Sequence, residues 1–155
     1  MQCVYDTVLS VIKKIDISEL FSFVFSAIAI SFSIYTYSKS RGIALYQDID
    51  RLYLELLKLG MENPRFLNPQ LTCNYQQSFC SDELYRYKAY AFIAWNICET
   101  ISDRRNDTEL FKTWLPVLKV ENNLHRAWFD AEENREKFKK EFQDFVKESF
   151  PHHSK

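Results

Sequence analysis

Two pairs of polar side chains on neighbouring predicted helices have the residue types and the spacing of a metal site. Glu99 and Asp103 are four residues apart, as are Glu121 and His125, so each pair shares one helix face. Carboxylates and an imidazole from two helices are possible metal ligands. Di-iron helical bundles, however, use two Glu-x-x-His pairs and two further glutamates. A single Glu-x-x-x-His does not match that pattern, so we expect no metal and no cofactor.

The same residues fit better as a half-buried polar network that fixes the register of neighbouring helices. Charged side chains inside proteins are normally paired with one another. The predicted network contains Asn96, Glu99, Asp103, Arg104, Glu121 and His125. Trp114 and Trp128 lie beside the last two on the edge of an apolar stripe, so this part of the network is predicted to face a core.

Nucleophilic catalysis lacks its usual residues in this chain. Cys98 lies on the seam of the most apolar helix, where a thiol packs as a small hydrophobic group. No G-x-S-x-G turn is present. His125 is the only histidine outside the C-terminal tail. We therefore predict no catalytic residue, and a metal-dependent or hydrolytic enzyme is the least favoured function.

Composition predicts an all-α protein. Only Gly42 and Gly60 are present, whereas an average composition of about 7% would give roughly 11 glycines. Phosphate-binding loops and tight hairpins both need glycine, so nucleotide loops and a large antiparallel sheet are disfavoured. The 13 Phe, 9 Tyr and 3 Trp can fill a large core. A net charge of −1 gives no basic face for nucleic acid, so no nucleic-acid partner is expected.

The four cysteines indicate free thiols. They are Cys3, Cys73, Cys80 and Cys98. Only Cys73 and Cys80 are close enough in the sequence to suggest a local pair, and whether they pair is left open. A C-x6-C spacing without a second half is not a zinc-binding pattern.

The strongest feature of the sequence is an uncharged stretch at residues 20–38. About 20 helical residues cross the ~30 Å hydrocarbon layer of a membrane. The Ser and Thr residues in this stretch can satisfy their hydroxyls on the carbonyl four residues earlier. We predict an amphipathic segment at 1–18 and a transmembrane helix at 19–38.

A buried core helix and a cleaved signal peptide are the two alternatives to a membrane span. Ala27, Ile28 and Ala29 have the small-x-small form of a cleavage site, but they lie in the middle of the apolar run. Two lysines precede the stretch, whereas four basic residues follow it: Lys39, Arg41, Arg51 and Lys58. This bias predicts a single-pass protein of the inner (plasma) membrane with a cytoplasmic C-terminal domain.

Small residues recur along the predicted span at alternating spacings of four and three. They are Ser22, Ser26, Ala29, Ser33 and Thr36. This spacing places them on one helix face, where small side chains let two helix backbones approach closely in lipid. We therefore predict that the span packs against a second copy or against a partner helix.

A helical domain is predicted at 39–150, followed by a tail at 151–155. Its first helix carries an apolar stripe of Leu45, Ile49, Leu52, Leu56 and Leu59. Gly60 follows the stripe, and we interpret it as the residue after a helix C-terminus. Residues 61–81 have no hydrophobic periodicity and predict a long loop. The two glycines thus mark two expected points of bending.

Three further helices complete a predicted bundle of about four. The first begins at Asp82 and buries a seam of Leu84, Tyr87, Ala91, Ala94, Cys98 and Ile101. Because residues 89–98 are apolar on nearly every side, this helix is expected to be central. The second begins near Asp107 or Thr108 and is interrupted or kinked at Pro116. The last follows residues 130–133 and buries Phe138, Phe142, Phe145 and Val146.

The segments YAFIAWNICETISDR and TWLPVLKVENNLHRAWF resemble small bacterial single-pass membrane proteins of unknown function. In these proteins one N-terminal span precedes an aromatic-rich cytoplasmic helical domain. The resemblance implies this architecture and a bacterial origin. It assigns no activity and no functional residue.

Two functions follow from these features. The first is a membrane-anchored helical interaction module that acts as a tether, sensor or regulator and binds a partner membrane protein or itself. The second is a membrane-active stress or phage-defence effector that oligomerises through the span.

Overall fold

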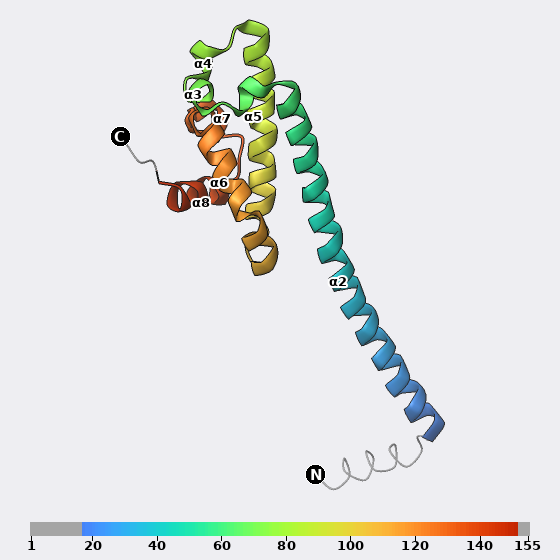
Figure 1. Cartoon of the computed structure of the whole chain (residues 1–155). Coiled ribbons are helices and arrows are strands. Elements are labelled where there is room, and N and C mark those ends of the chain that lie inside the picture. Colours follow the sequence, from blue (N-terminus) through green and yellow to red (C-terminus); the bar gives the residue numbers. More distant parts are fainter. Residues whose placement is uncertain (1–16, 152–155) are drawn as a thin grey trace. The chain divides into compact units, whose positions relative to one another are not determined.

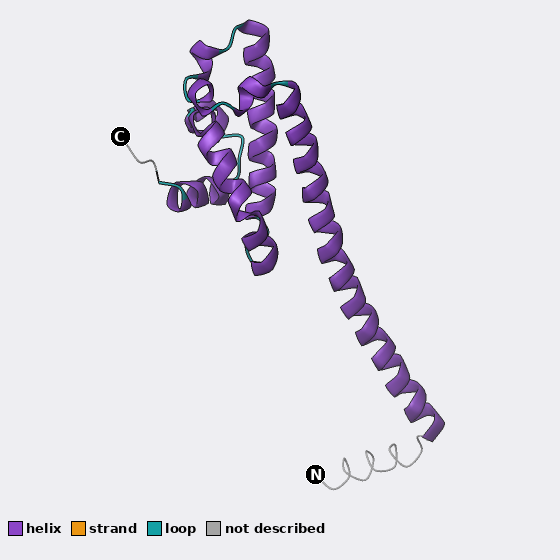
Figure 2. Ribbon diagram, viewed as in Figure 1, coloured by secondary structure: helices purple, strands orange, loops and turns teal. Residues whose placement is uncertain are grey.

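The computed structural model describes residues 17–151, and every regular element among them is a helix (Figures 1 and 2). The prediction of an all-α protein is therefore confirmed for this range. Most of the amphipathic segment expected at 1–18 lies outside the described residues, as does the tail beyond Pro151.

The first helix, α2, extends from Ile17 to Glu62 without interruption at Gly42. It contains the predicted span and the predicted first helix of the C-terminal domain. The chain divides into two compact units between Leu45 and Tyr46, and we describe each by itself.

In the first unit, the side chains of the predicted span are exposed. Phe23 and Phe25 are 74% and 76% exposed. An 18-residue window of the helix has a mean hydropathy of 1.7 and none of it is buried. By length and composition this helix can cross a membrane. All five residues of the predicted small-residue face are exposed: Ser22, Ser26, Ala29, Ser33 and Thr36.

Three serine hydroxyls in the span are satisfied within the helix. Ser22 donates to the Ser18 carbonyl at 3.0 Å, Ser26 donates to Ser22 at 2.8 Å, and Ser31 donates to Ala27 at 2.8 Å. These bonds confirm the prediction that hydroxyls in this stretch donate to the carbonyl four residues earlier. They lower the free-energy cost of placing a hydroxyl in an apolar environment.

In the second unit, α5 (Ser81–Ser102) and α6 (Thr108–Asp130) lie side by side and form the main interface (Figure 1). Most of the predicted seam of α5 is buried, from Tyr87 to Ile101. Phe92 and Ile93 are partly exposed, so α5 is not enclosed on every side as expected. The helix begins at Ser81, one residue before Asp82.

Helix α6 begins where the sequence predicts. Asp107 is its N-cap, and the Asp107 carboxylate accepts a hydrogen bond from the Leu110 N–H at 3.2 Å. Pro116 lies inside α6 on an exposed face, and the helix continues through it to Asp130. An interruption at Pro116 is therefore wrong, and the alternative of a kink there stays a prediction.

The part of α2 that belongs to the second unit buries a different face from the predicted one. Ile49 and Leu56 are buried as expected, but Leu52 and Leu59 are 40% exposed. Tyr53 takes the place of Leu52 in the buried row. The spacing of four and three is retained, and of the predicted stripe Ile49 and Leu56 face the core.

Gly60 lies inside α2, and no glycine among the described residues has a positive φ. The interpretation of Gly60 as the residue that ends a helix is therefore wrong. A Cβ at this position would lie 2.9 Å from the Tyr90 hydroxyl and 3.1 Å from Leu67 Cδ2. Glycine suits this position because the side chains of Tyr90 and Leu67 approach its Cα closely, and they would have to shift for a Cβ.

Residues 61–81 are not the expected long loop. They contain three single-turn helices, namely η1 (Pro64–Leu67), α3 (Pro69–Thr72) and α4 (Tyr75–Ser78), joined by short connections (Figure 2). Each turn buries one side chain or more against the core: Phe66, Thr72, Tyr75 and Phe79. Single turns are too short to produce a hydrophobic period, so no periodic pattern marks them in the sequence.

The predicted last helix is divided into two. A short turn, α7 (Glu132–Arg135), and a longer helix, α8 (Lys140–Ser149), are separated by residues 136–139. The predicted apolar residues still face the core. Phe138, Phe142 and Val146 are buried, and Phe145 is partly buried against them.

The two glycines provide a matched test of this packing. Gly60→Ala should destabilise the second unit by about 1 kcal/mol, because overpacking costs about 1–3 kcal/mol and the helix propensity of alanine recovers about 1. Gly42→Ala meets no atom within 4 Å and should leave stability unchanged or raised. The measurement is thermal unfolding of the full chain in detergent, monitored by the circular dichroism of the aromatic side chains. Equal or higher stability of Gly60→Ala would contradict the close contact.

Candidate functional site

Five polar side chains from three helices meet inside the second unit, and we call them the polar core. They are Tyr53, Tyr87, Tyr90, Glu121 and His125. Glu121 is 2% exposed and His125 is 0% exposed. Ionisable side chains are seldom buried so completely, so this cluster is the main candidate for a functional site.

The local sequence of each helix explains how the polar core forms. Glu121 and His125 lie one turn apart on α6, within the buried row that also contains Trp114, Leu118 and Trp128. Helix α5 supplies two tyrosines from its apolar seam, and α2 supplies Tyr53. Tyrosine brings an apolar ring into a core and needs a partner for its hydroxyl.

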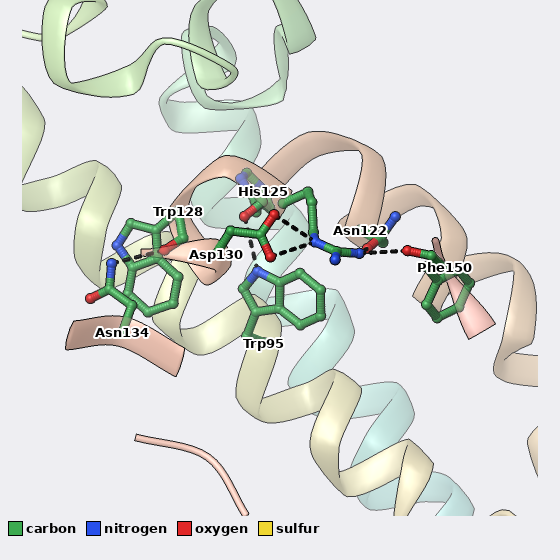
Figure 3. A network of polar contacts seen from close by, with 8 residues as sticks. Trp95, Asn122, His125, Trp128, Asp130, Asn134 and Phe150 are labelled. Atoms are coloured by element: carbon green, nitrogen blue, oxygen red, sulfur yellow. Dashed lines mark hydrogen bonds and ion pairs between the residues drawn. The ribbon is translucent and has the colours of Figure 1, made fainter. Parts of the chain in front are cut away.

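Four short contacts connect the polar core. Tyr53 Oη donates to Glu121 Oε1 at 3.4 Å, and Tyr87 Oη lies 3.1 Å from His125 Nδ1. Glu121 Oε2 and His125 Nε2 are 3.5 Å apart. Trp95 Nε1 donates to the main-chain carbonyl of His125 at 3.1 Å, and Figure 3 shows the indole directed at this residue. The imidazole is thus held between Tyr87 of α5 and Glu121 of its own helix.

Burial shifts the protonation equilibria of both ionisable side chains on α6. Desolvation raises the pKa of Glu121 to about 7, and the hydrogen bond from Tyr53 lowers it only in part. Desolvation lowers the pKa of His125 to about 3. His125 is therefore neutral at pH 7, and Glu121 is close to the midpoint of its titration.

Three buried atoms of the polar core have no hydrogen-bond partner among the described residues. They are Tyr90 Oη, Glu121 Oε2 and His125 Nε2. Leaving a buried polar atom unpaired costs about 1–3 kcal/mol. Such a concentration of unpaired atoms in one place is uncommon in a folded protein.

The other four residues of the predicted network lie outside the polar core. Glu99 accepts a hydrogen bond from the Lys139 N–H at 2.8 Å, and Asp103 forms an ion pair with the Lys139 side chain. Asn96 donates to the Phe92 carbonyl on its own helix. Arg104 is half-buried, and its Nε has no partner among residues 17–151. These four residues, on α5 and just after it, thus lie apart from the buried pair of Glu121 and His125 on α6.

A second polar network connects the end of α6 to the end of α8 (Figure 3). Arg126 Nε donates to both carboxylate oxygens of Asp130, at 2.8 and 2.9 Å. The Nη1 of the same side chain donates to the Phe150 carbonyl at 2.7 Å and to Asn122 Oδ1 at 3.2 Å. The Arg126 guanidinium therefore holds the C-terminal end of α8 against α6.

A surface groove of about 630 Å³ borders this network between α6 and α8. Its lining contains Arg126, Arg135, Lys140 and Lys147 together with Asp130 and Asp144. Ion pairs join Arg126 to Asp130 and Lys140 to Asp144. The lining thus has four basic side chains and two acidic ones, and both acidic side chains are paired with basic ones.

No set of three His, Cys, Asp or Glu side chains within residues 17–151 is arranged to hold a metal ion. Cys73, Cys80 and Cys98 are free thiols. No family model, no curated protein and no solved structure matches this chain. The resemblance to small bacterial membrane proteins accordingly stays a prediction.

Sequence reasoning identifies Glu121 and His125 but misses the role of the three tyrosines beside them. It places Tyr87 in an apolar seam, and it does not distinguish Tyr53 or Tyr90 from the surrounding residues. A usable signal is present, because Tyr87 and Tyr90 are three residues apart on a helix face predicted to be buried. A buried tyrosine pair implies polar partners nearby.

The Arg126 network can be tested by removing the guanidinium. Arg126→Met should lower the free energy of unfolding by about 2 kcal/mol, because hydrogen bonds to charged groups contribute about 1.5–3 kcal/mol. Lys140→Met is the control, since the Lys140–Asp144 pair is exposed and should contribute less than about 0.5 kcal/mol. Denaturant unfolding of the full chain measures both variants. Equal losses would show that the arginine does not hold α8 in place.

Proposed function

We propose that the protein is a single-pass membrane protein whose helical C-terminal unit acts on the cytoplasmic side as a tether, sensor or regulator. The observation that carries the proposal is the combination of an uncharged stretch at 20–38 with the exposure of every side chain in it. A core helix of a soluble protein would be mostly buried, whereas none of this window is. A lipid bilayer would cover these apolar side chains.

Two further features support an anchored protein. Three serine hydroxyls of the span are already bonded within the helix, so insertion would not leave these donors unsatisfied. Basic residues are more frequent after the stretch than before it, as expected when the following domain is cytoplasmic. The second unit has an aromatic core of its own, and its described residues form no recognisable catalytic arrangement, which favours an interaction role.

A charge in the middle of the stretch tests membrane insertion. Ala29→Arg should move much of the protein from the alkali-resistant membrane fraction to the soluble fraction, because a central charge costs about 2.5–3.5 kcal/mol on insertion scales. Ser38→Arg adds the same side chain beside Lys39 and should leave the protein in the membrane. Wild-type protein in the alkali-soluble fraction would contradict the proposal.

Self-association through the small-residue face is a separate prediction. Ser26→Leu combined with Ser33→Leu should weaken crosslinked dimers in membranes, because larger side chains keep the two backbones apart. Ser31→Leu is the control, since Ser31 lies about 180° from that face. Unchanged crosslinking of the double variant would exclude this face. Growth arrest and dye leakage on expression would instead favour a membrane-active effector.

A further inference from the structure

The unpaired atoms of the polar core point to a role for a proton. We propose that Glu121 carries a proton below neutral pH and shares it with His125, so that the two side chains form a proton-operated latch joining α2 to α5 and α6. The inference rests on the second unit alone and does not depend on the membrane proposal.

The first step is the contact between the two side chains. Glu121 Oε2 and His125 Nε2 are 3.5 Å apart, and neither has another partner among residues 17–151. Without a proton, the anionic oxygen would have only the neutral ring as a neighbour, either an Nε2 lone pair or a single Nε2–H at this distance, and no cation. A proton on Glu121 Oε2 becomes a donor to His125 Nε2 after a small rotation, and it satisfies both atoms at once.

The second step is the tautomer of the imidazole. If Nε2 accepts from Glu121, the ring proton lies on Nδ1, and Nδ1 donates to Tyr87 Oη at 3.1 Å. Tyr53 donates to the other oxygen of Glu121. Each group then donates to the next, from Tyr53 through Glu121 and His125 to Tyr87. This chain crosses from α2 through α6 to α5.

The third step is the absence of a compensating charge in the described part of the pocket. The titratable groups that act on Glu121 are His125 on α6, Tyr53 on α2, and Tyr90 and Cys98 on α5. Burial raises the pKa of Tyr90 and of Cys98, so both stay neutral. Burial likewise raises the pKa of Tyr87, which faces the imidazole and is approached by Tyr75, Thr72 and Cys73. A Glu121 carboxylate would therefore be a buried anion without a cation, which is strongly unfavourable.

The expected pH dependence has two opposing parts. The pKa of Glu121 is raised, so its contribution is complete below pH 4.5 and is lost as the pH rises through about 7. The pKa of His125 is lowered, so its contribution is complete above pH 6.5 and is lost as the pH falls towards about 3. Between pH 4.5 and pH 6.5 the contributions of Glu121 and His125 to stability change in opposite directions and largely cancel. Above neutral pH Glu121 is ionised, and the latch is loosened.

Infrared spectroscopy of the full chain in detergent detects the proton directly. At pH 6 wild-type protein should show the carbonyl band of a protonated carboxylic acid, and the band should fade as the pH rises above 7. Glu121→Gln should abolish it. Glu55→Gln, the same change at an exposed site on α2, should retain it. Nitrogen NMR should show the His125 proton on Nδ1. Absence of the band, or a proton on Nε2, would overturn the proposal.

Hydrogen exchange of residues 49–62 measures the strength of the latch, after correction for the intrinsic pH dependence of exchange. From pH 5.5 to pH 8.5 the equilibrium constant for local opening should fall about tenfold in Glu121→Gln, because only His125 of the pair can titrate in this variant. It should rise about thirtyfold in His125→Gln and change by about threefold or less in wild type and Glu55→Gln. Identical profiles for Glu121→Gln and wild type would contradict the latch. The infrared measurement uses wild-type protein, so it holds even if His125→Gln does not fold.

Discussion

The second unit depends on the burial of Trp95 between α5 and α6. The indole stacks on Phe129 of α6 at 4.2 Å and meets the edge of Phe142 of α8 at 6.0 Å. Its N–H donates to the His125 carbonyl in the middle of α6. These contacts fix the register of the two long helices, and that register brings the His125 ring to Tyr87. The polar core is thus a consequence of aromatic packing rather than an independent feature.

The two halves of α2 differ in whether their apolar side chains are buried. The half in the second unit contributes Ile49, Tyr53 and Leu56 to a protein core and ends beside Tyr90, where Gly60 removes a clash. The half at 20–38 exposes apolar side chains and satisfies three of its serine hydroxyls, which suits a lipid environment. A single helix with both properties supports an anchored domain better than it supports a soluble one, because exposed apolar surface of this extent favours association.

Long periodic segments were predictable from the sequence, and contacts between distant segments were not. The seam of α5 and the start of α6 near Asp107 depend on local sequence, so the sequence predicts them well. The turns between residues 61 and 81 are held by tertiary burial of Phe66 and Tyr75, which no local period reveals. Gly60 has the position of a helix-ending residue, but its role comes from Tyr90 on another helix. The polar core was half predicted for the same reason, because Glu121 and His125 are one turn apart whereas the tyrosines come from elsewhere.

The central claim is that residues 20–38 lie in a membrane, and cysteine accessibility in intact membranes tests it most directly. In a background without native cysteines, Ala29→Cys should react with a water-soluble maleimide only after the membrane is dissolved. A protein with Cys73 restored as its single thiol should react once the cytoplasmic face is opened, because this thiol is exposed. Equal reactivity at both positions, in vesicles that have been opened but whose membrane has not been dissolved, would contradict the claim.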